Sequence, residues 1–524
     1  MATLRLKTNQ HNLIANLRHA FTQASMLGEL LQNARRAQAS VIHIAVTQDS
    51  LSIIDNGIGI ANLQTLICIA ESGWDEQIKA SENAFGLGVL STLYFAEVLM
   101  VHSRDKWFGA RTSDIIAGQP FDDEAAPFYI EGTTIHLEGV KPVGHEQHLP
   151  TWVESELRRL CEAFPVPVWL NGVEVPRPLT DPELQWRETA MGKVLIDLSA
   201  AHTQWRTLLQ GLPIGRVPTW MQHQIVLLPD NMLAKLPDRQ HLLNEAEDRP
   251  RIQAAVDLAY REALIEKKAS LDPRAFCEHY AASCLTSSNA DLLNDVPFVP
   301  RAWFRDWQGE PAGIHRYWQH YGASGIVARD ELEKIGVWRI ETDEDDEHTA
   351  EVYLEARNAF LLHESGMDSG HWLKSLVRTI TPEQVQVRTG ATLYQDREPF
   401  LADYDVELEL VDELFVSLNG HSDAAEYAVQ ALRRGYTLYL TPSAGAPTNL
   451  VSDYIFDDRY DENRENEDKE LIATFIAVGC SSAPDQVVSA LLPNSLWSMR
   501  QAKLAGAVVR LIFDEAGRLT AVTS

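Results

Sequence analysis

The chain has little cysteine and no long uncharged apolar run. Its 524 residues hold five cysteines, an odd and widely spread set that suits a reducing compartment better than a disulfide framework. No uncharged apolar stretch reaches the ~18 residues that a membrane helix needs, and the first residues lack the apolar core of a secretory signal. These absences predict a soluble cytoplasmic protein.

Basic residues are scarce relative to acidic ones. The chain has 45 Lys and Arg against 74 Asp and Glu, a formal net charge of −29 at pH 7. Because affinity for nucleic-acid phosphates comes mainly from Lys and Arg, nucleic acid is a disfavoured partner, although a local basic groove stays open. About −19 of the charge lies from Glu331 onward, including acidic runs over 341–347 and 457–470. Such runs are mostly solvated loops, with a partner-docking surface as the alternative.

The remaining composition is that of a globular protein, with 45% hydrophobic and 23% charged residues. At roughly 100–200 residues per domain the length corresponds to about three domains. Hydrophobic spacing and turn residues predict helices and strands in alternation: a helix over 13–39, strands over 41–46, 51–54, 97–102 and 133–137, a helix over 152–164, a hairpin at Asn171-Gly172 and a helix over 250–268. We therefore expect an α+β protein with a first domain over 1–143, an α/β middle domain over 144–300 and an acidic α/β region over 301–524.

The first predicted helix carries a carboxylate and an amide on one face. Glu29 and Asn33 are four residues apart and so project from the same side of a helix. A carboxylate can orient and deprotonate a water molecule, and an amide oxygen can coordinate a hard cation such as Mg²⁺. Taken alone the pair is common, and a solvated helix face is the ordinary interpretation.

A turn rich in glycine follows the second predicted strand, in the segment DNGIGI. Asp55 can accept a hydrogen bond from an exocyclic amine, while Gly57 and Gly59 allow a ligand to approach the backbone closely. A calcium loop is not indicated, because the twelfth position counted from Asp55 is Leu66 rather than Glu.

A second glycine pair, Gly86 and Gly88 in the segment FGLGVLS, opens an apolar helix. Backbone N–H groups at the start of a helix bind phosphate. The segment is neither a Walker A loop nor a complete G-x-G-x-x-G, so by itself it is a weak signal.

These three segments, joined by Gly132-Thr133-Thr134 on a later strand, resemble the Bergerat-fold (GHKL) ATPases, the superfamily of gyrase B, heat-shock chaperones, histidine kinases and MutL. The resemblance covers residues 1–140 and, more faintly, 145–270. It implies an N-terminal α/β sandwich that binds ATP and Mg²⁺ and hydrolyses ATP under a mobile lid, formed here by the segment between Ile60 and Phe85.

The resemblance also implies a role for each matching residue: Glu29 as the general base, Asn33 as the Mg²⁺ ligand, Asp55 as the acceptor for the adenine amine, Gly57 and Gly59 as walls of the base pocket, Gly86 and Gly88 as phosphate binders, and Thr133 as the completion of the adenine site. One departure is clear. The family often has Asp three residues after the metal-binding Asn, and this chain has Arg36 there.

Two branches of the superfamily are the best matches. The run FGLGVLSTLYFAEVLMVHSRD, with a Val-rich strand that ends in Ser plus a charge, is similar to the heat-shock chaperone pattern, whereas the short spacing from Glu29 to Asp55 is closer to MutL and the topoisomerase VI B subunit. The chaperone branch implies a homodimer that remodels a protein client. The alternatives are a DNA-processing clamp and a non-hydrolysing ATP sensor in a larger assembly.

Both branches place a basic side chain of the next domain at the γ-phosphate; Arg239 is the candidate, with Lys267 and Lys268 as weaker ones.

Other candidate clusters have simpler interpretations. Cys277, His279 and Cys284 lack a second pair of metal ligands, so ordinary packed or surface positions are favoured. The tryptophans at 303, 307 and 318 fit core or interface packing better than a partner groove. A solvated loop is favoured over a metal-dependent nuclease site for the last acidic cluster: Asp453, Asp457, Asp458 and Asp461.

Overall fold

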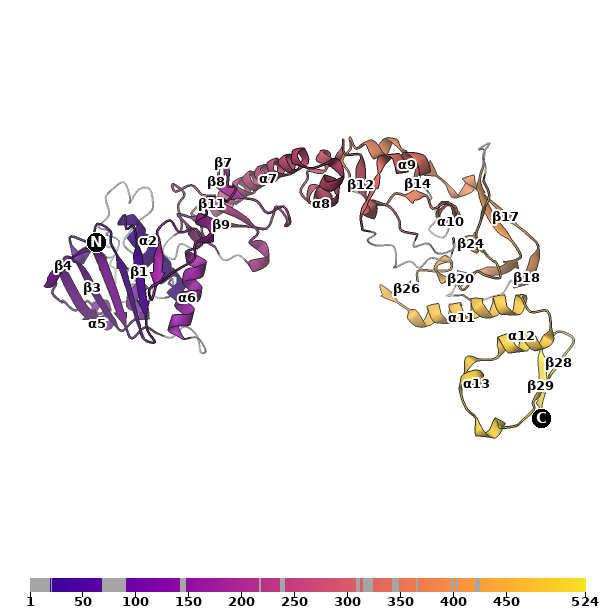
Figure 1. Ribbon diagram of the computed structural model, residues 1–524. Helices are drawn as coiled ribbons and strands as arrows, with labels where there is room; N and C mark the ends of the chain where they lie inside the picture. The colour runs from indigo at the N-terminus through magenta and orange to yellow at the C-terminus, as the bar shows by residue number, and fades with distance from the viewer. Residues whose placement is uncertain are drawn as a thin grey trace, which may run out of the picture. The chain divides into compact units, whose positions relative to one another are not determined.

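The structure is a computed structural model of a mixed α/β protein. It describes residues 19, 21–67, 91–141, 148–215, 218–235, 241–307, 312–313, 324–341, 348–363, 366–396, 400–401, 404–419 and 425–524. The chain divides into two compact units, one of residues 1–272 with 282–290 and the other of residues 273–281 with 291–524 (Figure 1). Within the described residues, no helix has the length and apolar character to span a membrane.

A six-stranded sheet opens the first unit, with the strand order β3-β4-β2-β1-β5-β6. Its strands are β1 (Ile42–Val46), β2 (Ser50–Asp55), β3 (Val98–Arg111), β4 (Glu124–Glu138), β5 (Val168–Leu170) and β6 (Val173–Glu174). Only β1 and β5 pair in parallel. In β1 buried and exposed residues alternate, as the sequence predicts, so one face of the sheet is buried and the other carries His43 and Ala45.

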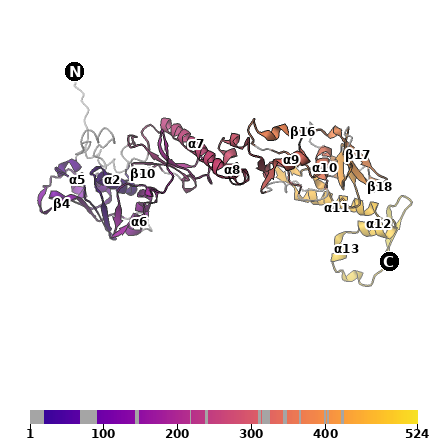
Figure 2. The same cartoon turned by 45° about the horizontal axis from the view of Figure 1, so that its top comes forward.

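Two helices cover the buried face and pack on one another (Figures 1 and 2): α2 (Gln23–Arg36) and α6 (Leu149–Leu160). A capping box between Thr22 and Ser25 begins α2 at Gln23, inside the expected range over 13–39, of which residues 13–18 and 20 lie outside the described residues. Leu27, Leu31 and Leu157 are almost fully buried, and each such side chain stabilises the fold by about 1.5–3 kcal/mol. The short helices α4 (Thr92–Phe95) and α5 (Thr112–Ile116) flank β3.

The sheet continues beyond residue 143. The predicted hairpin at Asn171-Gly172 is confirmed: it joins β5 to β6, and both residues have the positive φ, 48° and 83°, that a two-residue turn of this type requires. β5 pairs with β1, and α6 packs in the same core. These elements follow the expected domain boundary at 143/144 in the chain, yet they belong to the first sheet and its helix layer.

A second, five-stranded sheet completes the first unit, with the order β10-β9-β11-β8-β7. Its strands are β7 (Arg187–Thr189), β8 (Gly192–Leu195), β9 (Trp205–Leu209), β10 (Leu212–Ile214) and β11 (Gln224–Leu228). The long helix α7 (Glu245–Ser270) packs on this sheet through Ile252, Val256 and Ala259. The helix predicted over 250–268 lies inside α7.

The second unit contains several small sheets. Its helices are α9 (Arg329–Ile335), α10 (Thr349–Ala356), α11 (Glu462–Gly479), α12 (Pro484–Leu491) and α13 (Asn494–Ser498), and α8 (Pro273–Thr286) crosses the division between the units. Its strands are β12 (Phe298–Pro300), β13 (Ile326–Ala328), β14 (Val337–Ile340), β15 (Phe360–Leu361), β16 (Val377–Ile380), β17 (Val385–Thr389), β18 (Thr392–Asp396), β19 (Phe400–Leu401), β20 (Tyr404–Asp405), β21 (Glu407–Val411), β22 (Leu414–Leu418), β23 (Tyr427–Ala428), β24 (Ala431–Arg434), β25 (Thr437–Leu440), β26 (Ile455–Phe456), β27 (Arg459–Tyr460), β28 (Arg510–Phe513) and β29 (Leu519–Thr523). Most of the strands β14 to β25 pack with α10 and α11 in one hydrophobic core. The expected boundary at 300/301 lies inside this unit.

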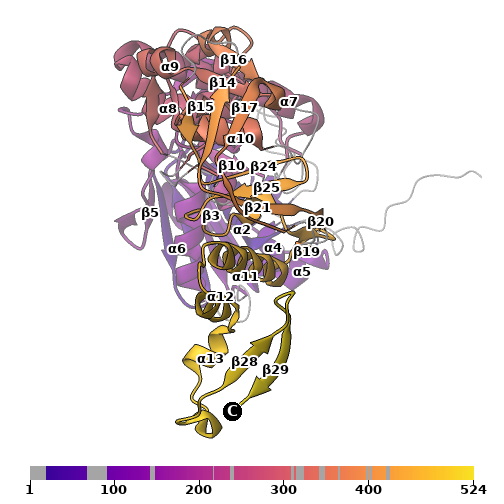
Figure 3. The same cartoon turned by 90° about the vertical axis from the view of Figure 1, so that its right-hand side faces the viewer.

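Two features of this unit bear on the sequence predictions. Trp303 and Trp307 are each 3% exposed, which confirms core packing for them; Trp318 lies outside the described residues. The prediction that the run 457–470 is a loop is wrong from Glu462 onward, because these residues form the first turns of α11. Asp461 caps that helix, and the acidic side chains after it suit the positive end of the helix dipole. Beyond α11, the chain continues with α12, α13 and the antiparallel pair of β28 and β29 (Figure 3).

Candidate functional site

Asp55 and Thr133 stand opposite each other at the end of the first sheet. The register pairs Asp55 of β2 with Thr133 of β4, and Thr133 in turn with Ser103 of β3. The Asp55 carboxylate accepts hydrogen bonds from the backbone N–H groups of Gly57, at 2.9 Å, and Thr133. Burial raises the pKa of the Asp55 carboxyl above its ordinary value, and these two N–H donors oppose the rise only partly. The sheet therefore brings together two of the residues that the sequence assigns to the adenine site.

The loop after Asp55 is held from several sides. The Asn56 side chain accepts from the N–H groups of Ser40 and Val41 at 2.9 and 3.1 Å, Ile58 N–H donates to the Ala37 carbonyl at 2.8 Å, and the guanidinium of Arg104 donates to the Ile58 carbonyl. A loop anchored in this way keeps the Asp55 carboxylate in one position against the end of α2.

Glycine is required here for steric reasons. A Cβ atom at Gly57 would lie 2.5 Å from the Ala37 carbonyl oxygen, and one at Gly132, where φ is 78°, would lie 2.0 Å from the Asp55 carbonyl oxygen. Gly59 also has positive φ, 67°. At Gly57 and Gly132 the backbone therefore approaches neighbouring backbone more closely than a side chain would allow.

The helix α2 carries Glu29 and Asn33, together with Arg36. The Arg36 guanidinium donates to the Asn33 side-chain oxygen at 3.2 Å and lies 3.9 Å from the Glu29 carboxylate. The Glu29 and Arg36 side chains are only 8% and 3% exposed, so the solvated-face interpretation does not hold for Glu29. Arg36 is thus a cation that contacts both the expected base and the expected metal ligand.

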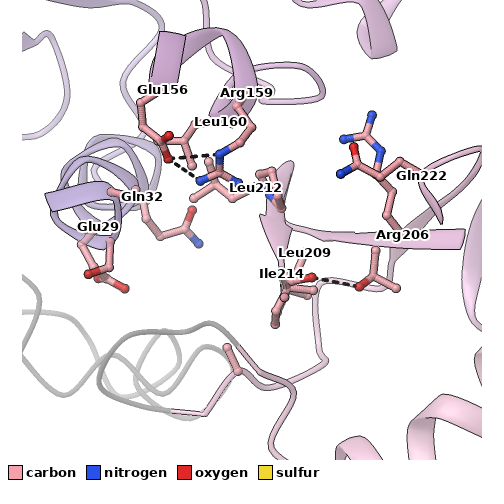
Figure 4. Close-up of a pocket in the computed structure, with 17 residues that line it drawn as sticks. Glu29, Gln32, Glu156, Arg159, Leu160, Arg206, Leu209, Leu212, Ile214 and Gln222 are labelled. Atoms are coloured by element: carbon pink, nitrogen blue, oxygen red, sulfur yellow. Dashed lines mark hydrogen bonds and ion pairs between the residues drawn. The ribbon is translucent and has the colours of Figure 1, made fainter. Parts of the chain in front are cut away.

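A cavity of about 380 Å³ borders Glu29 and Gln32 on one side and the second sheet on the other (Figure 4). Gln32 extends from α2 toward Leu209 and Ile214, while Arg159 of α6 is paired with Glu156. Arg206 of β9 also lines this cavity and is bonded to Glu162. The two sheets of the first unit therefore meet beside the expected catalytic carboxylate.

Several predicted site residues fall outside the described part of the chain. These are Gly86 and Gly88, the expected lid from residue 68 onward, and Arg239. Lys267 and Lys268 lie in the last turn of α7 and do not line the cavity beside Glu29.

No metal centre is formed by clustered ligands in the described ranges: no three His, Cys, Asp or Glu side chains there are arranged to hold an ion. Burial raises the pKa of the Cys277 thiol to about 12, so it stays protonated and is a poor ligand. Asn33 offers one amide oxygen. Since Mg²⁺ usually takes most of its ligands from water and substrate phosphates, one or two protein oxygens suffice, but the bond from Arg36 competes for this one.

Ser103 is a site residue to which the sequence assigns no role. It is fully buried, its hydroxyl donates to the Gly132 carbonyl at 2.7 Å, and the same oxygen accepts from Ile60 N–H at 2.8 Å and contacts the Thr133 hydroxyl at 3.1 Å. The sequence signal that could have identified Ser103 is its place at the end of a predicted Val-rich strand, directly before the charged Arg104. Its partners lie about 30 to 45 residues away in the chain, which no local pattern reveals.

Comparison with protein-family models and with curated proteins found no match for this chain.

Proposed function

We propose that the first unit binds ATP at the end of its six-stranded sheet and hydrolyses it in the presence of Mg²⁺. The pairing of Asp55 with Thr133 carries the proposal, because it joins residues almost 80 positions apart that the Bergerat-fold pattern assigns to one adenine site. The half-buried Asp55 carboxylate can accept a hydrogen bond from the exocyclic amine of a base.

In this proposal Asp55 accepts a hydrogen bond from the adenine amine and Thr133 completes the contact with the base. Glu29 acts as the base that orients and deprotonates the attacking water, and Asn33 supplies the amide oxygen for Mg²⁺. The bound metal supplies charge stabilisation to the phosphates. The output we propose is a closure cycle that acts on a protein client, the use that the chaperone-like pattern implies.

Two substitutions test the assignment. Glu29→Ala should retain ATP binding and lose hydrolysis, whereas Asp55→Asn should lose binding. Glu154→Ala, which removes an exposed carboxylate of α6 paired with Arg158, is the matched control and should change neither. Equal turnover in the wild type and in Glu29→Ala would contradict the role of Glu29, and retained affinity in Asp55→Asn would contradict the adenine site.

A second function, a sensor that binds ATP without turning it over, is supported by Arg36. Its guanidinium contacts the oxygens of both Glu29 and Asn33, so it reduces their availability to water and metal. Isothermal titration together with a sensitive phosphate-release assay separates the two functions, because a sensor binds ATP but releases no phosphate above the Glu29→Ala background.

A further inference from the structure

A tight turn of the second sheet enters the first layer. Leu209 pairs with Leu212, so Gln210 and Gly211 form a two-residue turn between β9 and β10, with φ values of 55° and 83°. A Cβ atom at Gly211 would lie 2.6 Å from the Ala163 carbonyl oxygen, and Leu212 packs against the core of the first sheet. This turn therefore docks the second sheet against α2, α6 and the segment before β5.

Gln210 is an unusual residue for that turn. Two-residue turns with positive φ at both positions favour Asn-Gly, and the same unit uses Asn171-Gly172 in its other such turn. Gln210 is 4% exposed, and its side chain bonds to both neighbouring segments: its oxygen accepts from the Gln32 amide, and its own amide donates to the Asp230 carbonyl at 3.2 Å. Asn adopts a positive φ more readily than Gln. The longer side chain of Gln, which reaches α2, accounts for its presence at this position.

Gln32 lies on the segment of α2 that carries the expected catalytic groups. It is 1% exposed and stands between Glu29 and Asn33 in the sequence, and its oxygen accepts from the Arg35 guanidinium at 3.2 Å. Because one turn of a helix moves as a rigid body, a bond that fixes Gln32 also fixes the rotation of Glu29 and Asn33 about the helix axis.

We propose that Gln210 is a positioning residue for the ATP site: through its hydrogen bond to Gln32, the β9–β10 turn sets the placement of Glu29, so that the second sheet controls the rate of hydrolysis. This inference rests on the proposed ATPase function. In this inference the hydrogen bond between Gln210 of the turn and Gln32 of α2 couples the second sheet to Glu29. Gln210 itself does not contact the nucleotide.

The test compares two glycine substitutions. Gln210→Gly keeps a residue that accepts positive φ and removes only the side chain, and Asn171→Gly does the same in the matched turn, where the lost side chain bonds to Val46 instead. We expect kcat to fall about tenfold in Gln210→Gly, within the roughly hundredfold that a 1 Å misplacement of a catalytic group can cause. The dissociation constant for ATP should stay within about twofold of wild type, and Asn171→Gly should retain wild-type kcat. In a double-mutant cycle, Gln32→Leu should add no further loss to Gln210→Gly.

The outcomes separate this inference from the function on which it rests. If Gln210→Gly retains wild-type kcat while Glu29→Ala is inactive, the positioning role is wrong and the ATPase function stands. An equal loss of affinity and turnover indicates general damage to the fold and also overturns the positioning role. If the wild type has no turnover, or Glu29→Ala keeps it, the ATPase function fails and this inference fails with it.

Discussion

The Arg36 guanidinium lies 3.9 Å from the Glu29 carboxylate, with both side chains buried. The same group donates to the Asn33 side-chain oxygen at 3.2 Å. One cation thus neutralises the residue proposed as the base and occupies the oxygen proposed for the metal. For the proposed ATPase we therefore expect Arg36 to restrain hydrolysis.

Arg36→Gln should relieve that restraint. Removing the cation leaves the Asn33 oxygen available to Mg²⁺. If Mg²⁺ then binds more tightly by about 1.4 kcal/mol, the half-saturating Mg²⁺ concentration falls tenfold. The free energy of unfolding should drop by about 1–3 kcal/mol, because buried polar groups lose a partner. Phosphate release against Mg²⁺ concentration checks the first expectation and urea unfolding the second. An unchanged Mg²⁺ dependence would show that Arg36 does not compete with the metal.

Asp55→Asn should abolish nucleotide binding without destabilising the free protein at neutral pH. Burial raises the pKa of Asp55, so folding favours its protonated form. The stability that this proton contributes is present at low pH and is lost as the pH rises through the folded-state pKa. Asn removes that dependence. In thermal melts at pH 7 the variant should match or exceed the wild type without ATP, while the stabilisation of about 2.7 kcal/mol expected from ATP at 100 times its dissociation constant should vanish.

Gly132→Ala should be far more damaging than Gly172→Ala. Both glycines have similar positive φ, 78° and 83°, so the backbone strain of about 1–2 kcal/mol is common to both. Only at Gly132 does the new Cβ atom meet another group, the Asp55 carbonyl oxygen at 2.0 Å, while the space around Gly172 is open to 4 Å. We expect Gly132→Ala to lose at least about 2 kcal/mol more in urea unfolding and to lose ATP binding. Equal losses in the two variants would rule out the close packing at Asp55.

His371 should make the second unit sensitive to acid. Burial lowers the pKa of this imidazole to about 4, although Asp368 opposes the shift. The stability linked to its neutral form is complete above about pH 6.5 and is lost as the pH falls toward 4. His371 packs edge-on against Trp303, so tryptophan fluorescence reports the unfolding. His371→Asn keeps an acceptor for the Leu373 N–H but takes up no proton in this range, and its midpoint in urea should change less between pH 7 and pH 5 than that of the wild type.

Local features of the sequence were enough to predict much of the first layer. The alternation in β1 and the positive-φ pair Asn171-Gly172 each depend on a few neighbouring residues, so their signals are complete within a short window. The start of α2 also depends on a local cap, Thr22 with Ser25. The charge of the run 457–470 favours a loop, whereas the cap at Asp461 starts α11 within it.

By itself the sequence determined which residues end the strands and which share a helix face: Asp55 at the end of a strand, and Glu29 with Asn33 four residues apart. Only the tertiary structure decided that Thr133 pairs with Asp55 on one side and with Ser103 on the other, that β5 joins the first sheet through β1, and that Gln210 reaches Gln32 across 178 positions. It also decided that Arg36 turns inward between Glu29 and Asn33. The physical reason is the distance along the chain over which each feature is determined. Backbone conformation and periodicity are set by adjacent residues. Contacts between distant segments depend on how whole layers pack, and no short window of sequence contains that information.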